Sequence, residues 1–138
     1  LDEVVASGKA FETFKDMVKA QGGNVDMIEN PELLPQSKFK TEIKSEESGN
    51  VKVLHSERLG VLAMQLGAGR ETKEQDVNHA VGLELACKRG DKVNKGDTIC
   101  IVYHDEELKP QWVDELYHAF ELTNEEVAPQ PIIEKVLS

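Results

Sequence analysis

The sequence predicts an α+β fold, in which an antiparallel sheet or barrel-sandwich packs against two helices. Three observations lead to this prediction. Short segments whose apolar residues alternate or run continuously, as in strands, are spread between residues 39 and 103. Segments with helical spacing are fewer and do not alternate strictly with the strands. A connector bounded by two prolines, residues 30–35, separates this part from a further amphipathic helix that we assign to a neighbouring domain.

The N-terminal part of the chain is predicted to be helical. Residues 8–21 carry an apolar stripe at helical spacing, and Gly22-Gly23 supplies a stop because glycine adopts the left-handed conformation at low cost. The stripe consists of Ala10, Phe11, Phe14, Met17 and Val18. The predicted division of the chain is terminal helices of a helical domain (1–23), a linker (24–35) and a C-terminal domain (36–138).

Two strands and a helix are predicted next. Residues 39–44 alternate between apolar and polar side chains, and Ser48-Gly49-Asn50 is expected to turn the chain into a second strand, residues 51–54. Ser56 is expected to cap a helix that ends at Gly67. The buried face of this helix is predicted to consist of Leu59, Leu62, Ala63 and Leu66.

The remaining elements follow a doubled Gly-Asp pattern. A strand at 80–88 should place Val81, Leu83, Leu85 and Cys87 on one face. Gly90-Asp91 and Gly96-Asp97 then predict two turns that lead into a buried strand, residues 99–103. Pro110 suits the first turn of a helix, and residues 132–137 are predicted to form a final strand. The helix should bury Trp112, Val113, Leu116, Ala119 and Phe120.

Composition excludes several classes of protein. The net charge of the 138-residue chain is −10, which disfavours binding to nucleic acid phosphates, and no apolar stretch is long enough to span a membrane. Without a Cys-x-x-Cys pattern, Cys87 and Cys100 are expected to be small buried residues on strands in a reducing cytoplasm. A disulfide between neighbouring strands is the alternative.

One short motif is a candidate for binding chemistry. Gly67, Ala68, Gly69 and Arg70 follow a predicted helix, and they could form a backbone nest for an anion with Arg70 as a bidentate donor. The alternative is a helix C-cap with a flexible turn, because the helix dipole points the wrong way for an anion at this end. The scattered histidines show no metal-ligand spacing, and no catalytic motif is present.

The doubled Gly-Asp hairpin is also typical of biotinyl and lipoyl carrier domains. A carrier requires an exposed lysine at the tip of a partner hairpin, whereas the expected tip here is Ser48-Gly49-Asn50, and Lys44 and Lys52 lie on the strands. A carrier domain and a free-standing binding module are therefore the alternatives to a part of an enzyme.

Three stretches together resemble the thymidine/pyrimidine-nucleoside phosphorylase family. They are GKAFETFKDMVKAQGG (8–23), LGVLAMQLGAGRETK (59–73) and DVNHAVGLELACKRGDKVNKGDTICIV (76–102). Their order and spacing match that family over essentially the whole chain. Gln21-Gly22-Gly23 and Lys95-Gly96-Asp97 are more similar to the pyrimidine-nucleoside branch, which accepts several nucleosides, than to the strict thymidine branch.

The resemblance implies that the chain is the C-terminal segment of such an enzyme, with a hammerhead-like C-terminal domain. Phosphate would attack C1′ of the pentose, and the pyrimidine base would leave. The family's phosphate loop, catalytic residues and monovalent-cation site lie upstream of Leu1, so no catalytic, cofactor or metal residue is carried over, and the segment alone is expected to be inactive. The expected partners of the parent protein are a pyrimidine nucleoside, phosphate and a second subunit. Residues 67–70 are expected to reach toward the cleft as a lid.

Overall fold

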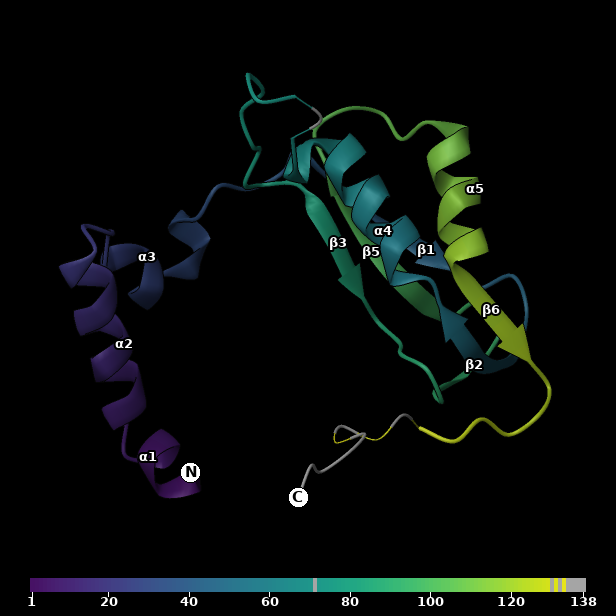
Figure 1. Ribbon diagram of the computed structural model, residues 1–138, viewed down its shortest axis with the longest axis horizontal. Coiled ribbons are helices and arrows are strands. Elements are labelled where there is room, and N and C mark those ends of the chain that lie inside the picture. Colours follow the sequence, from purple (N-terminus) through teal and green to yellow (C-terminus); the bar gives the residue numbers. More distant parts are fainter. Residues whose placement is uncertain (71, 130, 132, 134–138) are drawn as a thin grey trace. The chain divides into compact units, whose positions relative to one another are not determined.

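The computed structural model describes residues 1–70, 72–129, 131 and 133 (Figure 1). The chain divides into two units, Leu1–Gln36 and Ser37–Ser138, each of which is described by itself. The assignment of residues 1–23, 24–35 and 36–138 to domains of a larger protein stays a prediction.

The first unit is helical, and the helix predicted at residues 8–21 is confirmed. Its elements are α1 (Asp2–Ala6), α2 (Lys9–Ala20), α3 (Asp26–Glu29) and the 3-10 turn η1 (Pro31–Leu33), so the segment predicted to be a linker contains two short helical turns. Gly22, at a φ of 79°, ends α2 as expected for glycine after a helix. The Nζ atom of Lys15 bridges Glu12 (2.8 Å) and Glu29 (3.1 Å), which ties α2 to α3. The apolar stripe of α2 lies at the surface of this unit, where Phe14 is 45% exposed.

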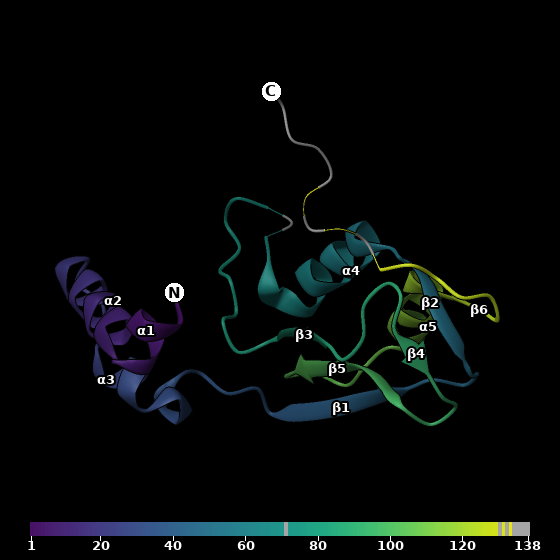
Figure 2. The ribbon, with the colours of Figure 1, turned by 90° about the horizontal axis from the view of Figure 1, so that it is seen from below.

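The second unit is α+β with antiparallel sheets, as the sequence predicted. One sheet has the order β1 (Phe39–Lys44), β5 (Thr98–His104), β3 (Gly82–Leu85). The other has the order β4 (Lys92–Val93), β2 (Gly49–Leu54), β6 (Phe120–Thr123). The helices are α4 (Ser56–Ala63) and α5 (Pro110–Ala119), and α4 lies over the sheet β1-β5-β3 in both views (Figures 1 and 2). Consecutive strands β1 and β2 belong to different sheets, so they do not form a hairpin.

Two Gly-Asp turns organise the centre of this unit, as predicted. In each turn the aspartate carboxylate accepts a hydrogen bond from the backbone N–H three residues before it, that of Lys88 (2.9 Å) for Gly90-Asp91 and that of Asn94 (2.8 Å) for Gly96-Asp97. Both glycines have a φ of 93°, the left-handed value that a type II turn requires at its third position. The repeated sequence therefore builds the same turn twice.

Each turn is bound in the same way to one residue at or after the end of β1, Val51 within β2 for the first turn and Ser45 directly after β1 for the second. The amide and the carbonyl of Val51 bond to the first turn at 2.9 Å, and those of Ser45 bond to the second turn at 2.8 Å. The repeat thus extends from the sequence to the hydrogen bonds between segments, and it fixes where β4 and β5 begin.

The hydrophobic core of the second unit lies between the two sheets and the two helices. Its buried residues are Ile43, Val51, Leu59, Leu62, Cys87, Val93, Ile99, Cys100, Val102, Trp112, Leu116, Ala119 and Phe120. Helix α5 begins at Pro110 as predicted, because proline has no N–H to lose in the first helical turn. The predicted strands at 39–44, 51–54 and 99–103 and both helices of this unit contribute buried residues to this core.

Several local predictions were wrong. The N-cap of α4 is His55, not Ser56, and the helix start is held instead by the His55 backbone N–H, which donates to the Ala119 carbonyl at 2.9 Å. Gly49 and Asn50 belong to strand β2 instead of a turn. A Cβ atom at Gly49 would lie 2.9 Å from the Thr123 carbonyl oxygen, so glycine lets β6 approach.

The strand around residues 80–88 is shorter than predicted. It ends at Leu85, which is 43% exposed, so Leu85 does not share a buried face with Val81. Cys87 therefore lies outside the strand, and both it and Cys100 are buried, free thiols, which excludes the alternative of a disulfide. Phe120 begins strand β6, which the sequence did not predict, and does not continue α5. The strand predicted at 132–137 falls on residues of which only 133 is described.

Candidate functional site

The loop that follows α4 is the candidate site, and two glycines shape its first residues. Helix α4 continues as the π-helical turn η2 (Met64–Ala68), inside which Gly67 has a φ of 107°. This left-handed value ends the helix, as predicted, and it strains any residue that carries a Cβ atom. Gly69 is extended, and a Cβ atom there would lie 3.0 Å from Cγ of Met64. The first glycine thus provides the turn and the second provides close packing against η2.

Arg70 is presented by this loop as an exposed side chain. It forms no hydrogen bond or ion pair with the residues that the structure describes. A guanidinium group has five N–H donors in a fixed planar arrangement that suits a carboxylate or a phosphate. The arrangement leaves these donors available for an anionic ligand.

Asn78 closes the root of the loop. Its backbone N–H donates to the Gly67 carbonyl at 2.9 Å, so residues 67 and 78 are held together. Its side-chain oxygen accepts the backbone N–H of Ala80 at 3.0 Å, which is a local Asx turn. Loops of this length whose ends lie close together are compact and frequently functional. Loop 67–78 thus has a defined base from which Arg70 projects.

Asp105 holds Asn78 from the neighbouring sheet. Its Oδ2 atom accepts a hydrogen bond from Nδ2 of Asn78 at 2.7 Å, and its Oδ1 atom accepts the backbone N–H of Lys38 at 2.8 Å. The hydrogen bond from Lys38, followed by that from Asn78, lowers the pKa of Asp105 below its usual value. Asp105 directly follows β5 and Lys38 directly precedes β1, so this carboxylate stands where the two paired strands meet.

His104 fixes the backbone from which Asp105 projects. The imidazole is 6% exposed, and its Nδ1 atom lies 2.6 Å from the Glu106 carbonyl oxygen. A carbonyl can only accept, so Nδ1 carries the proton and donates, and Nε2 accepts from the Thr41 hydroxyl at 2.7 Å. The ring also stacks on Phe39 with a centroid distance of 5.4 Å. His104 thus has a structural role at the end of the β1–β5 ladder.

A pocket of about 260 Å³ lies beside the loop root. Three of the side chains that line it are the carboxylates Asp76, Asp105 and Glu106. Negative charge of this density repels phosphate, so an anionic ligand would be bound by Arg70 and not by the pocket. Among the described residues, no group of three or more His, Cys, Asp or Glu side chains could hold a metal ion.

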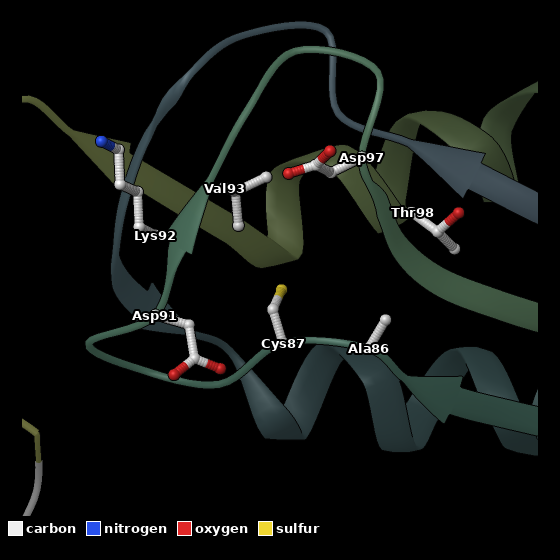
Figure 3. A pocket seen from close by; sticks show the side chains of 7 residues that line it. All are labelled: Ala86, Cys87, Asp91, Lys92, Val93, Asp97 and Thr98. Carbon is white, nitrogen blue, oxygen red and sulfur yellow. The ribbon is translucent and has the colours of Figure 1, made fainter.

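A second hollow, of about 500 Å³, lies between the two Gly-Asp turns. Figure 3 shows the sulfur of Cys87 directed into this hollow toward Val93. Burial, with a smaller contribution from the Asp91 carboxylate, raises the pKa of the Cys87 thiol, so the reactive thiolate is disfavoured. The carboxylates of Asp91 and Asp97 already accept backbone N–H groups. The carboxylates that line this hollow are therefore explained by their role in the two Gly-Asp turns.

The segment opposite the second Gly-Asp turn bears on the alternative of a carrier domain. The Oγ atom of Ser48 accepts the backbone N–H of Lys95 at 2.8 Å, so the segment that joins β1 to β2 is the partner of the second Gly-Asp turn. Residues 45–48 of that segment are Ser, Glu, Glu and Ser, which provide no amine for attachment of a cofactor.

None of the helices in the described residues is long and apolar enough to cross a membrane.

Comparison with known proteins relates this geometry to a family. The model of the family described as "Pyrimidine nucleoside phosphorylase C-terminal domain" matches residues 50–123. The pyrimidine-nucleoside phosphorylase of Bacillus subtilis (strain 168) is 39% identical over 132 residues, which are 96% of this chain and 30% of that protein. The enzyme of the same name from Staphylococcus aureus (strain USA300) is 38% identical over 138 residues, 100% of this chain and 32% of that protein. The chain thus spans about a third of the length of these relatives.

Proposed function

Because the chain belongs to the pyrimidine-nucleoside phosphorylase family and contains its C-terminal domain, we propose that it is the C-terminal part of an enzyme that cleaves pyrimidine nucleosides with phosphate. The resemblance predicted from the sequence is confirmed at the level of the family. In the proposed reaction an oxygen of phosphate forms a bond to C1′ of the pentose. The bond from C1′ to the base nitrogen breaks, and the base leaves with the electron pair and takes up a proton. The products are the free pyrimidine and a pentose 1-phosphate, so the enzyme is a pentosyltransferase of pyrimidine salvage.

In this proposal the segment supports and closes the active-site cleft and is inactive alone. The observation that carries the proposal is an exposed arginine on a loop whose base is fixed by hydrogen bonds of 2.7–2.9 Å. A fixed base limits the conformations that Arg70 must lose when it meets an anion, and this lowers the entropic cost of closing. A closed loop excludes water, which strengthens the interaction of a guanidinium with phosphate or with the departing base.

The partners in the proposal follow from the family. The nucleoside, phosphate and a monovalent cation would bind residues upstream of this segment, and phosphate is a co-substrate. The active protein would be a cytoplasmic homodimer. Nucleic acid is not expected as a partner, because the chain carries a net charge of −10.

A kinetic experiment on the full-length protein tests the role of the loop. Arg70→Ala should lower kcat/KM for uridine phosphorolysis by at least about tenfold, as expected when one charged donor to a developing negative charge is removed. Arg89→Ala is the matched control, because Arg89 is also an exposed arginine next to a glycine turn, but it lies in the first Gly-Asp turn. Equal kcat/KM values for Arg70→Ala and the unmodified protein would refute the closing role.

The 138-residue chain alone tests the second half of the proposal. Mixed with uridine and phosphate, it should release no uracil above a blank, whereas the full-length protein should. Saturable turnover by the isolated chain would contradict the proposal that the catalytic residues lie upstream.

A further inference from the structure

Asp105 joins two places that are far apart in the sequence. One oxygen of its carboxylate holds the backbone amide of Lys38, and the other holds the side-chain amide of Asn78. Asn78 in turn holds Gly67 through its own backbone N–H. Among the hydrogen bonds of the described residues, Lys38 and Asn78 are connected through this carboxylate and not to each other. The start of β1 and the root of loop 67–78 therefore share one anchor.

The Asp105 carboxylate cannot move with one of its two hydrogen-bond donors without affecting its bond to the other. Asp105 comes directly after His104, whose ring is fixed by Thr41 and by the Glu106 carbonyl. His104 is also paired with Phe39 at the end of the β1–β5 ladder. The backbone at residue 105 is thus held on both sides, and adjustment is left to rotation of the Asp105 side chain. Because that rotation moves both oxygens together, a displacement at Lys38 is transmitted to Asn78.

Ionisation makes Asp105 suitable for this task. A carboxylate accepts hydrogen bonds at both oxygens, whereas a protonated acid loses acceptor capacity at one of them. Its two amide partners keep the pKa of Asp105 below the usual value, so the group is charged at neutral pH and both bonds are charge-assisted.

We propose that Asp105 is a positioning residue that couples the root of loop 67–78 to the start of β1, so that a displacement of the chain leading into β1 changes the position of the loop. With respect to the reaction, this inference rests on the proposed closing role of the loop. Closing would then be tied to the connector that precedes β1. The coupling itself is a property of the fold and can be measured without turnover.

Three variants separate coupling from simple loss of stability. Asn78→Ala removes the side-chain donor at the loop root and leaves Asp105 and Lys38 intact. Asp105→Asn keeps an oxygen for the Lys38 amide but turns an NH₂ group toward the NH₂ group of Asn78. The double variant N78D/D105N reverses donor and acceptor, since Asp at position 78 can accept from Asn at position 105. It should restore the bond that each single variant breaks.

Hydrogen exchange of the full-length protein, read by mass spectrometry, tests the coupling. In Asn78→Ala, the peptide that contains the Lys38 amide should exchange roughly three- to tenfold faster, the change expected when one hydrogen bond is weakened. Asp105→Asn should accelerate the exchange of both the Lys38 peptide and the peptide of residues 67–80. N78D/D105N should return both exchange rates toward those of the unmodified protein. Peptides of strand β5 should not change in any of these variants.

Two results would overturn the inference. One is an unchanged Lys38 peptide in Asn78→Ala, and the other is failure of N78D/D105N to slow the exchange seen in Asp105→Asn. Asp91→Asn is the matched control, because the Asp91 carboxylate also holds a backbone amide, that of Lys88. Asp91→Asn should accelerate hydrogen exchange in the turn around Lys88 and leave the exchange of the Lys38 peptide and of the loop peptide unchanged.

The same set of proteins distinguishes this inference from the proposed function. If exchange responds as expected and Arg70→Ala lowers kcat/KM, both the coupling and the closing role of the loop stand. In that case Asp105→Asn should also lower kcat/KM, and N78D/D105N should restore it. If exchange responds but Arg70→Ala retains full kcat/KM, the coupling stands and the closing role of the loop fails.

Discussion

Gly67 and Gly69 should respond in opposite ways to the same pair of substitutions. Gly67 has a φ of 107°, but a Cβ atom there would meet its nearest neighbours, on Asn78 and Val81, at an ordinary 3.6 Å. Any cost at this position is therefore backbone strain, which amounts to about 1–2 kcal/mol for a residue with a Cβ atom in the left-handed region. Asparagine tolerates this region better than alanine. Gly67→Asn should then destabilise the chain less than Gly67→Ala, although asparagine is the larger residue.

At Gly69 the order should be reversed. Its backbone is extended with a φ of −140°, which any residue adopts, but a Cβ atom would lie 3.0 Å from Cγ, 3.1 Å from Cβ and 3.3 Å from Cα of Met64. The cost is therefore crowding, about 1–3 kcal/mol for an added group in a packed site, and it should grow with the size of the side chain. Gly69→Asn should destabilise more than Gly69→Ala.

Urea unfolding of the 138-residue chain measures the four free energies. Because the prediction concerns the order within each pair, it does not depend on the absolute stability of the chain. If alanine is better tolerated than asparagine at Gly67, strain is not the cause there. If the order at Gly69 is the same as at Gly67, the distinction between turn and close approach is refuted.

Three further predictions concern the core, the loop root and the thiols. Leu116 is 1% exposed, so Leu116→Ala should lower the free energy of unfolding by about 2–5 kcal/mol, whereas Leu85→Ala, at 43% exposure, should change it by less than about 1 kcal/mol in the same urea titration. The pKa of Asp105 is lower in the folded chain than in the unfolded chain. Its stabilising contribution to the fold is therefore fully present above the ordinary carboxyl pKa, and it is lost as the pH falls through the pKa of the folded state. Exchange at the loop root, corrected for intrinsic rates, should rise between about pH 5 and pH 2 in the unmodified protein and not in Asp105→Asn. Burial, together with Cys87, raises the pKa of Cys100 to about 11, so iodoacetamide at neutral pH should leave both thiols unlabelled until urea unfolds the chain, and labelling of the folded chain seen by intact mass would contradict this.

Elements with a strong local signal were predicted from the sequence. Glycine at a position that requires a positive φ identified the two Gly-Asp turns and, at Gly67, the end of the helical stretch formed by α4 and η2, because no other residue adopts that backbone so readily. Alternation at residues 39–44 and helical spacing after Pro110 likewise identified β1 and α5. Strand β6 was missed because Phe120 and its neighbours continue the apolar spacing of α5, and only pairing with β2 makes this segment a strand.

The α+β class, most of the elements and the family could be predicted from the sequence, since each of these depends on short-range preferences or on motifs read in order. The sequence did not predict that β1 and β2 belong to different sheets, or that Asn78 and Lys38 meet at the carboxylate of Asp105. Those contacts join residues far apart in the chain. They are selected by the energy of the whole fold, in which each strand and each buried polar group takes the partner that leaves the fewest others unsatisfied.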